Sequence, residues 1–297
     1  MAIKTVGLLS PGDMGHSIGH VLHSNGLRVL TCLEGRSERS RELAGRAGIE
    51  DGGSLEDVVK EADLFISVLV PSSALSVAKS VATALHASGS TVVYADCNAV
   101  APNTVRGVAD LITEAGSSVA DVGIIGPPPR KPGTKFYVSG PGATRFSELG
   151  SHGLDIRVLD GDIGQASALK MCYGALTKGL QALATELLVA ARLAGIEEAL
   201  REEQTETMGE VLGWLEGNMP IMPPKAYRWV GEMEEIGSFF GSLGMTPDIL
   251  NGAADVYRFV AETPIGKESP ETRDPNRELD GVIAALAEAL SDRNNAS

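Results

Sequence analysis

The strongest constraint on the fold is a regular alternation of short apolar runs with longer amphipathic segments over the first 115 residues. The apolar runs have the length and composition of buried strands, and the segments between them have helical periodicity. Strands are expected at residues 6–9, 27–32, 64–70, 91–95, 119–125, 135–139 and 156–159. This order predicts a doubly wound parallel sheet, which binds ligands outside the carboxyl ends of its strands.

The character of the chain changes near residue 161. One long stretch rich in Ala and Leu runs from residue 162 to about 194 without a proline, and every later segment also has helical period. We therefore expect two domains: a Rossmann-type α/β domain over residues 1–161 that binds a dinucleotide, followed by an all-α domain over residues 162–297 that binds substrate and forms a dimer.

Composition limits the possible partners. The formal net charge is −14, which repels nucleic acid and anionic membrane surfaces. Three widely spaced cysteines do not form a disulfide framework and are expected to be buried and reduced. No apolar stretch is long enough to span a bilayer. A cytoplasmic protein with no nucleic-acid or membrane partner is expected. No metal site is expected either, although His16, His20 and His23 share one helix face.

An incomplete glycine fingerprint follows the first apolar run. Ser10 stands at the first position of G-x-G-x-x-G, and Gly12 and Gly15 occupy the second and third. Gly12 would let the backbone approach a pyrophosphate, and Gly15 would let the helix pack closely on the strand. A strand–turn–helix without a ligand is the alternative.

The end of the second predicted strand carries two opposing signals for the cofactor. Glu34 suits the ribose hydroxyl of NAD, whereas Arg36, Ser37 and Arg39 suit the 2′-phosphate of NADP. We expect NADP, with NAD possible. The alternative is that Ser37 caps a helix over residues 38–47 and that the arginines are solvated.

Lys170 is an unusual residue of the long helical stretch. Its neighbours at helical spacing, which are small, aromatic or hydroxylated, predict a covered face: Ala166, Ser167, Tyr173, Gly174 and Thr177. A partly buried lysine loses some preference for its charged form and could exchange a proton with a hydroxyl or carbonyl group of a substrate. A lysine that extends its amine from a buried helix to solvent is the alternative.

These segments together resemble the β-hydroxyacid dehydrogenase family, which contains 3-hydroxyisobutyrate and 6-phosphogluconate dehydrogenases and, more distantly, imine reductases. The resemblance covers nearly the whole chain. The turn Gly12-Asp13-Met14-Gly15 matches the family's G-x-M-G. Gly164 and Lys170 match its catalytic motif G-x-G-x-x-x-K-x-x-N, in which Ala166 and Tyr173 replace the second glycine and the asparagine.

Two further segments carry the resemblance. Asp96-Cys97-Asn98 is similar to the motif that flanks the nicotinamide, with Asn98 at a position where the family usually has threonine or serine. The substrate-carboxylate segment D-A-P-V-S-G-G appears as residues 121–127, with Ile125 in place of the serine, which counts against a simple 3-hydroxyisobutyrate-like substrate. Arg130, Lys131 and Lys135 could supply the missing contact to an anion.

The resemblance implies a set of site residues. The expected cofactor contacts are Ser10, Gly12, Asp13, Met14, Glu34, Arg36, Ser37, Val68, Leu69, Val70 and Asn98. The expected substrate contacts are Asn98, Gly123, Ile124, Ile125, Lys170, Tyr173 and Thr177, with Lys170 and Tyr173 as the catalytic residues.

The expected function is an NADP-preferring oxidoreductase that interconverts a hydroxyl and a carbonyl on a small polar, anionic molecule, with Lys170 as general acid/base. Two alternatives stay open. The presence of Lys170 counts against imine reduction, because family members that reduce imines typically lack this lysine, whereas the presence of Tyr173 leaves that reaction open. A non-catalytic NADP sensor would explain the departures at Ser10 and Ile125. The apolar helices suggest a homodimer through the helical domain, with Arg228, Glu232 and Glu235 on a solvated helix face.

Overall fold

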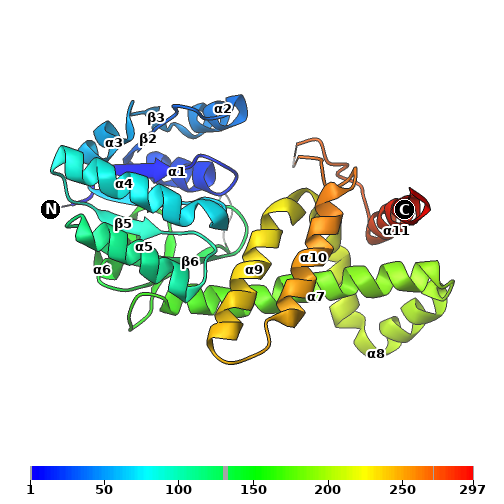
Figure 1. The fold of residues 1–297 in the computed structure, drawn as a ribbon. Helices are drawn as coiled ribbons and strands as arrows, with labels where there is room; N and C mark the ends of the chain where they lie inside the picture. The colour runs from blue at the N-terminus through cyan, green and yellow to red at the C-terminus, as the bar shows by residue number, and fades with distance from the viewer. Residues whose placement is uncertain (1, 130–132, 270, 297) are drawn as a thin grey trace. The chain divides into compact units, whose positions relative to one another are not determined.

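The computed structural model describes residues 2–129, 133–269 and 271–296 (Figure 1). The chain divides into two compact units, residues 1–171 and 172–297. The division falls inside one long helix, α7 (Gln165–Leu193). Arg130 and Lys131, named above as possible anion contacts, lie outside the described residues.

The first unit contains one mixed sheet. Within the described residues it has eight strands in the order β3-β2-β1-β4-β5-β6-β7-β8. The strands are β1 (Thr5–Leu9), β2 (Arg28–Thr31), β3 (Glu50–Asp51), β4 (Leu64–Ser67), β5 (Val93–Asp96), β6 (Ser118–Ile125), β7 (Lys135–Ser139) and β8 (Asp155–Val158). All neighbouring pairs are parallel except β6 and β7. The predicted doubly wound sheet is confirmed, while the antiparallel pair and the two-residue strand β3 were not predicted.

Helices cover both faces of this sheet (Figure 1). Among the described residues of this unit, six α-helices precede α7: α1 (Gly15–Ser24), α2 (Glu38–Ala47), α3 (Leu55–Glu61), α4 (Ala74–Ser88), α5 (Pro102–Glu114) and α6 (Ala143–Ser147). One apolar core joins the sheet to α1, α2 and α6, and a second core joins its other face to α3, α4 and α5. Strand β4 shows why its sequence is continuously apolar: Leu64 and Ile66 enter the first core, and Phe65 enters the second.

Helix α7 leads into a unit that is all-helical in the described residues, as predicted. It contains α8 (Glu197–Asn218), α9 (Ala226–Ser242), α10 (Asp248–Glu262) and α11 (Leu279–Ala296). Helices α9 and α10 pack together, with the rings of Trp229 and Tyr257 edge to face at 5.2 Å. No described helix is long and apolar enough to cross a membrane.

The expectation of three buried thiols is met fully by Cys97 alone and is wrong for Cys172. Cys97 is buried and Cys32 is half-buried, but Cys172 is exposed. In α7 the buried neighbours of Cys172 are Met171 and Gly174, which lie at other angles around the helix, so that Cys172 falls on an uncovered face.

The glycine turn after β1 gives a test of the fold. A Cβ added to Gly15 would lie 1.9 Å from the carbonyl oxygen of Ser10, whereas one added to Gly45 in α2 would meet no atom within 4 Å. We expect Gly15→Ala to lower the free energy of unfolding by about 1–3 kcal/mol through overpacking. Gly45→Ala should raise it by up to about 1 kcal/mol, because alanine favours the helix. Denaturant unfolding of both variants measures this, and equal effects would contradict the packing described.

Candidate functional site

The order of the strands reverses between β1 and β4, and two of the expected cofactor residues meet there. The backbone N–H of Ser10, just after β1, donates to the carbonyl oxygen of Val68, just after β4, over 3.1 Å. The N–H of Val68 donates in turn to the carbonyl oxygen of Leu9. In open α/β sheets, ligands bind at this kind of reversal, outside the carboxyl ends of the strands.

The start of α1 borders the same reversal. An added Cβ at Gly12 would have only the Ser10 hydroxyl oxygen near it, at 3.9 Å, so the backbone at Gly12 is open to a close approach. Gly15 is packed tightly against Ser10, as described above. The N-terminus of a helix attracts anions through its N–H groups and its dipole. The two glycines therefore have the distinct surroundings that a dinucleotide pyrophosphate site requires, and the group fits this turn.

The residues expected to read the ribose lie after β2. Ser37 is the N-cap of α2, and its side chain accepts a hydrogen bond from the backbone N–H of Ser40 over 3.3 Å. Arg39 forms an ion pair with Asp13 of the glycine turn at 2.5 Å. Glu34 is exposed and Arg36 is half-buried. Ser37 thus caps α2, which was the alternative to a phosphate contact. The ion pair between Asp13 and Arg39 joins the glycine turn to α2.

Asn98 connects the ends of β4 and β5. Its side-chain oxygen accepts from the backbone N–H of Leu69 over 2.6 Å. Its side-chain nitrogen donates to the hydroxyl of Ser67 over 3.1 Å and to the carboxylate of Asp96 over 2.9 Å. The residue is buried. Asn98 therefore fixes the loop of residues 68–70 onto the end of the neighbouring strand β5. Val70, at the end of that loop, is exposed.

A row of buried polar residues crosses the sheet at this edge. Ser67, Asp96, Asp121 and Ser139 are register partners on the adjacent strands β4, β5, β6 and β7. None is more than 1% exposed. They lie on the face that α3, α4 and α5 cover, because Phe65 and Tyr94, two residues earlier, belong to that core. Asp96 and Asp121 were not among the expected site residues. The signal for them in the sequence is a polar residue within, or at the end of, each of several adjacent apolar strands.

Asp96 has an unusual charge environment. Burial, together with the nearby charge of Asp121, raises the pKa of Asp96 to about 7, even though two hydrogen bonds from Asn98 and the positive charge of Lys170 act to lower it. Burial also raises the pKa of the neighbouring Cys97 thiol, which therefore remains neutral. Lys170 is thus close enough to the strand ends to act on both groups.

Helix α7 lies directly on β6 at Gly123. A Cβ added there would be 2.5 Å from the carbonyl oxygen of Ala166 and 3.2 Å from the Cβ of Lys170. Gly123 thus allows the contact that brings Lys170 against the sheet. Ile124 points the other way, into the core shared with α1, α2 and α6, so only its main chain could contact a ligand on the Lys170 side. Ile125 is half-buried.

Tyr173 and Thr177 belong to the second unit. Tyr173 is 51% exposed, so the prediction that its side chain lies on a covered face of α7 is wrong. The hydroxyl of Thr177 donates to the backbone carbonyl of Tyr173 over 3.0 Å. Among the residues that the structure describes, no three His, Cys, Asp or Glu side chains are grouped to hold a metal ion.

Glu232 was expected on a solvated helix face, and this is wrong. It is 9% exposed and pairs with Lys178 at 2.5 Å. The amine of Lys178 also lies 5.5 Å from the centre of the Trp229 ring, and the Tyr257 hydroxyl donates to the Lys178 carbonyl over 2.6 Å. Two helices therefore meet α7 around one buried ion pair, which the charge pattern of α9 alone did not reveal.

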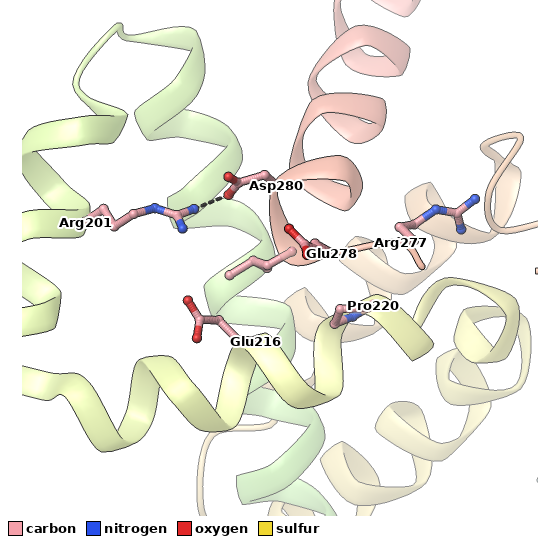
Figure 2. Close-up of a pocket in the computed structure, with 7 residues that line it drawn as sticks. Arg201, Glu216, Pro220, Arg277, Glu278 and Asp280 are labelled. Atoms are coloured by element: carbon pink, nitrogen blue, oxygen red, sulfur yellow. Dashed lines mark hydrogen bonds and ion pairs between the residues drawn. The ribbon is translucent and has the colours of Figure 1, made fainter. Parts of the chain in front are cut away.

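A separate cavity of about 390 Å³ lies in the second unit (Figure 2). Its wall includes Arg201, which bonds Asp280, and Arg277, whose two terminal nitrogens bond Glu268 at 2.8 and 2.6 Å. Glu216 and Glu278 add negative charge to the same wall. Since both arginines are already paired with carboxylates, this cavity is less suited to an anion than the strand ends of the first unit.

Two sequence families match the chain. The NAD binding domain of 6-phosphogluconate dehydrogenase matches residues 4–146, and a domain of unknown function, DUF1932, matches residues 191–260.

Known proteins are similar over most of the chain. An uncharacterized 28.5 kDa protein of Methanothermus fervidus is 32% identical over 205 residues, which are 69% of this chain and 78% of that protein. A conserved protein of unknown function, described as structurally similar to 3-hydroxyacid dehydrogenases, is 29% identical with a TM-score of 0.66, covering 87% of this chain and 97% of the other. Mycobacterium tuberculosis 3-hydroxyisobutyrate dehydrogenase with L-serine is 19% identical with a TM-score of 0.69, covering 98% and 99%, and shares the fold.

The raised pKa of Asp96 predicts a pH-dependent stability. The folded chain keeps this proton up to about pH 7, whereas an unfolded aspartate releases it near 3.8. The unfolded state binds fewer protons in that window, so the Asp96 contribution lowers the free energy of unfolding by about 1.4 kcal/mol per pH unit as the pH rises. Denaturant unfolding at pH 5, 6 and 7 should show this slope reduced in Asp96→Asn but not in Asp110→Asn, an exposed control on α5. Identical slopes in all three proteins would contradict it.

Proposed function

Because the chain belongs to the family that joins an NAD-binding domain of the 6-phosphogluconate dehydrogenase type, with a 3-hydroxyacid dehydrogenase-like fold, to a DUF1932 helical domain, we propose that it is an oxidoreductase. It interconverts a hydroxyl and a carbonyl on a small anionic substrate. The observation that carries this proposal is the placement of Lys170 against β6, where its charge acts on Asp96 at the carboxyl ends of the strands.

Lys170 is the general acid/base of the proposed reaction. In reduction its ammonium group donates a proton to the carbonyl oxygen of the substrate, and in oxidation its amine accepts the proton of the hydroxyl. Asp96 and Asn98 hold the polar strand end beside it. A nicotinamide dinucleotide, when bound, supplies or accepts the hydride.

The first unit holds the cofactor in this proposal. Gly12 and the start of α1 take the pyrophosphate, because the backbone is open at Gly12. The loop of residues 68–70, fixed by Asn98, borders the nicotinamide end. NADP is preferred because Arg36 lies just before α2, at the helix start where a 2′-phosphate is read. Ser37 keeps its capping role and can add one hydrogen bond from its hydroxyl.

A substrate panel followed by nicotinamide absorbance tests the reaction class. The panel contains 3-hydroxyisobutyrate, L-serine, 6-phosphogluconate, the corresponding short aldehydo acids and a cyclic imine. Turnover of a hydroxy acid or its carbonyl partner supports the proposal. Turnover of the imine alone would replace it with imine reduction, and tight NADPH binding without any turnover would replace it with an NADP sensor.

Replacement of the lysine gives the sharpest prediction for the chemistry. Lys170→Ala should lower kcat by about 10²–10⁴-fold, the usual contribution of a general acid/base. The Kd of NADPH, measured by fluorescence, should change little, since the residues assigned to the pyrophosphate are elsewhere. Lys60→Ala, which removes an exposed lysine of α3, is the matched control and should leave both constants unchanged. Full turnover by Lys170→Ala would exclude the lysine from the reaction.

Arg36 should determine the cofactor preference. Arg36→Ala should weaken NADPH binding by about 10-fold, the loss of one charge-assisted contact to phosphate, and leave NADH binding unchanged. Arg46→Ala, on the last turn of α2, serves as the control. If wild-type protein binds NADH more tightly than NADPH, Glu34 sets the preference instead.

We further propose that two chains pair through their helical halves. Leu176 and Leu183 are 69% and 59% exposed and lie one above the other on α7 at a spacing of seven residues. Light scattering should give twice the mass of one chain, and Leu183→Arg should reduce it to that of one chain. A monomeric wild type would contradict this proposal.

A further inference from the structure

The start of α7 is capped by the sheet, not by the helix itself. Gly164, directly before the helix, has no side chain and takes φ +104°, a conformation that favours glycine. The first N–H groups of a helix lack partners within it and need acceptors from elsewhere. Here the N–H of Gln165 donates to the carbonyl oxygen of Asp162, and those of Ala166 and Ser167 donate to side chains of β6 and β7.

The carboxylate of Asp121 is the principal acceptor. One of its oxygens, Oδ2, accepts from the backbone N–H of Gly164 over 2.8 Å and from that of Ser167 over 3.1 Å. The other oxygen, Oδ1, accepts from the Ser167 hydroxyl over 2.6 Å. Asp121 is fully buried, so these bonds form where water does not compete and where a negative charge is favoured by the helix dipole.

Ser139 completes the connection. Its hydroxyl donates to Asp121 Oδ2 over 3.1 Å and accepts from the backbone N–H of Ala166 over 3.1 Å. Three residues at the helix start, 164, 166 and 167, are thereby held by two side chains of the buried polar row, Asp121 and Ser139. Lys170 follows one turn later, on the stretch of α7 that rests on Gly123.

We infer that Asp121 is a positioning residue for Lys170: its carboxylate attaches the first turn of α7 to β6 and so fixes the place from which the lysine amine projects. The inference rests on the proposed function for its catalytic meaning. It goes beyond that proposal by assigning a task to a buried carboxylate that does not touch the reacting atoms.

The attachment can be tested without a substrate. Hydrogen exchange of the backbone amides 164–168 and acetylation of Lys170 by acetic anhydride, relative to exposed Lys60, are measured in wild type and Asp121→Asn. We expect exchange about tenfold faster and a Lys170:Lys60 acetylation ratio changed by about threefold or more. If either readout is unchanged in a folded Asp121→Asn protein, the inference is overturned.

Two further variants make the result specific. Asp63→Asn is the matched control, because Asp63 also accepts two backbone N–H groups, those of Lys4 and Thr5, at the opposite end of β1; it should alter neither readout. Should Asp121→Asn fail to fold, Ser139→Ala removes only the link to Ala166 and to one carboxylate oxygen. It should speed exchange of amides 166–168, and unchanged exchange there would overturn the inference.

Turnover separates this inference from the proposed function. If both hold, Asp121→Asn lowers kcat by about 100-fold, as displacement of a catalytic group does, with little change in the Kd of NADPH. In a Lys170→Ala background the same change should cost less than about threefold, because the positioned group is already absent. Retained turnover in Lys170→Ala would end the proposed function while leaving the exchange result standing. If Asp121→Asn lowers kcat by the same factor with and without Lys170, the positioning role is overturned and the proposed function is not affected.

Discussion

Parallel register is the constraint on which the site depends. Because β1, β4, β5 and β6 run in one direction, their carboxyl ends lie at one edge of the sheet, and residues far apart in sequence become neighbours. The register that pairs Ser67 with Asp96 also pairs Asp96 with Asp121. The reversal of strand order between β1 and β4 opens the same edge to the glycine turn. The parallel arrangement thus brings the glycine turn, the row of buried polar residues and Lys170 to one edge of the sheet.

Burying two carboxylates side by side is costly, and the structure offsets that cost with named partners. Asp121 is surrounded by donors from α7 and Ser139, and Asp96 accepts from Asn98 and feels the charge of Lys170. Such a cluster depends on every one of these hydrogen bonds, because the loss of one donor would leave a buried carboxylate without a compensating partner. The same bonds therefore stabilise the helix start and fix the site.

Local sequence signals predicted most elements, because they act within a few residues. Ser37 caps α2, Pro102 begins α5, and the apolar runs became strands. What was missed depends on distant pairing. The antiparallel β7, the row formed by Asp96 and Asp121, and the burial of Glu232 against Lys178 all require knowing which segments become neighbours. Periodicity within one segment does not carry that information.

The central claim is that Lys170 and the glycine turn serve one site. Acetylation of Lys170 in the presence of NADPH tests it most directly, with no knowledge of the substrate, and with exposed Lys60 as internal reference. A bound nicotinamide beside the lysine should slow Lys170 acetylation by about threefold or more at saturating NADPH and leave Lys60 unchanged. If NADPH binds and the two lysines are acetylated as in its absence, the cofactor and the lysine do not share a site, and the account is contradicted.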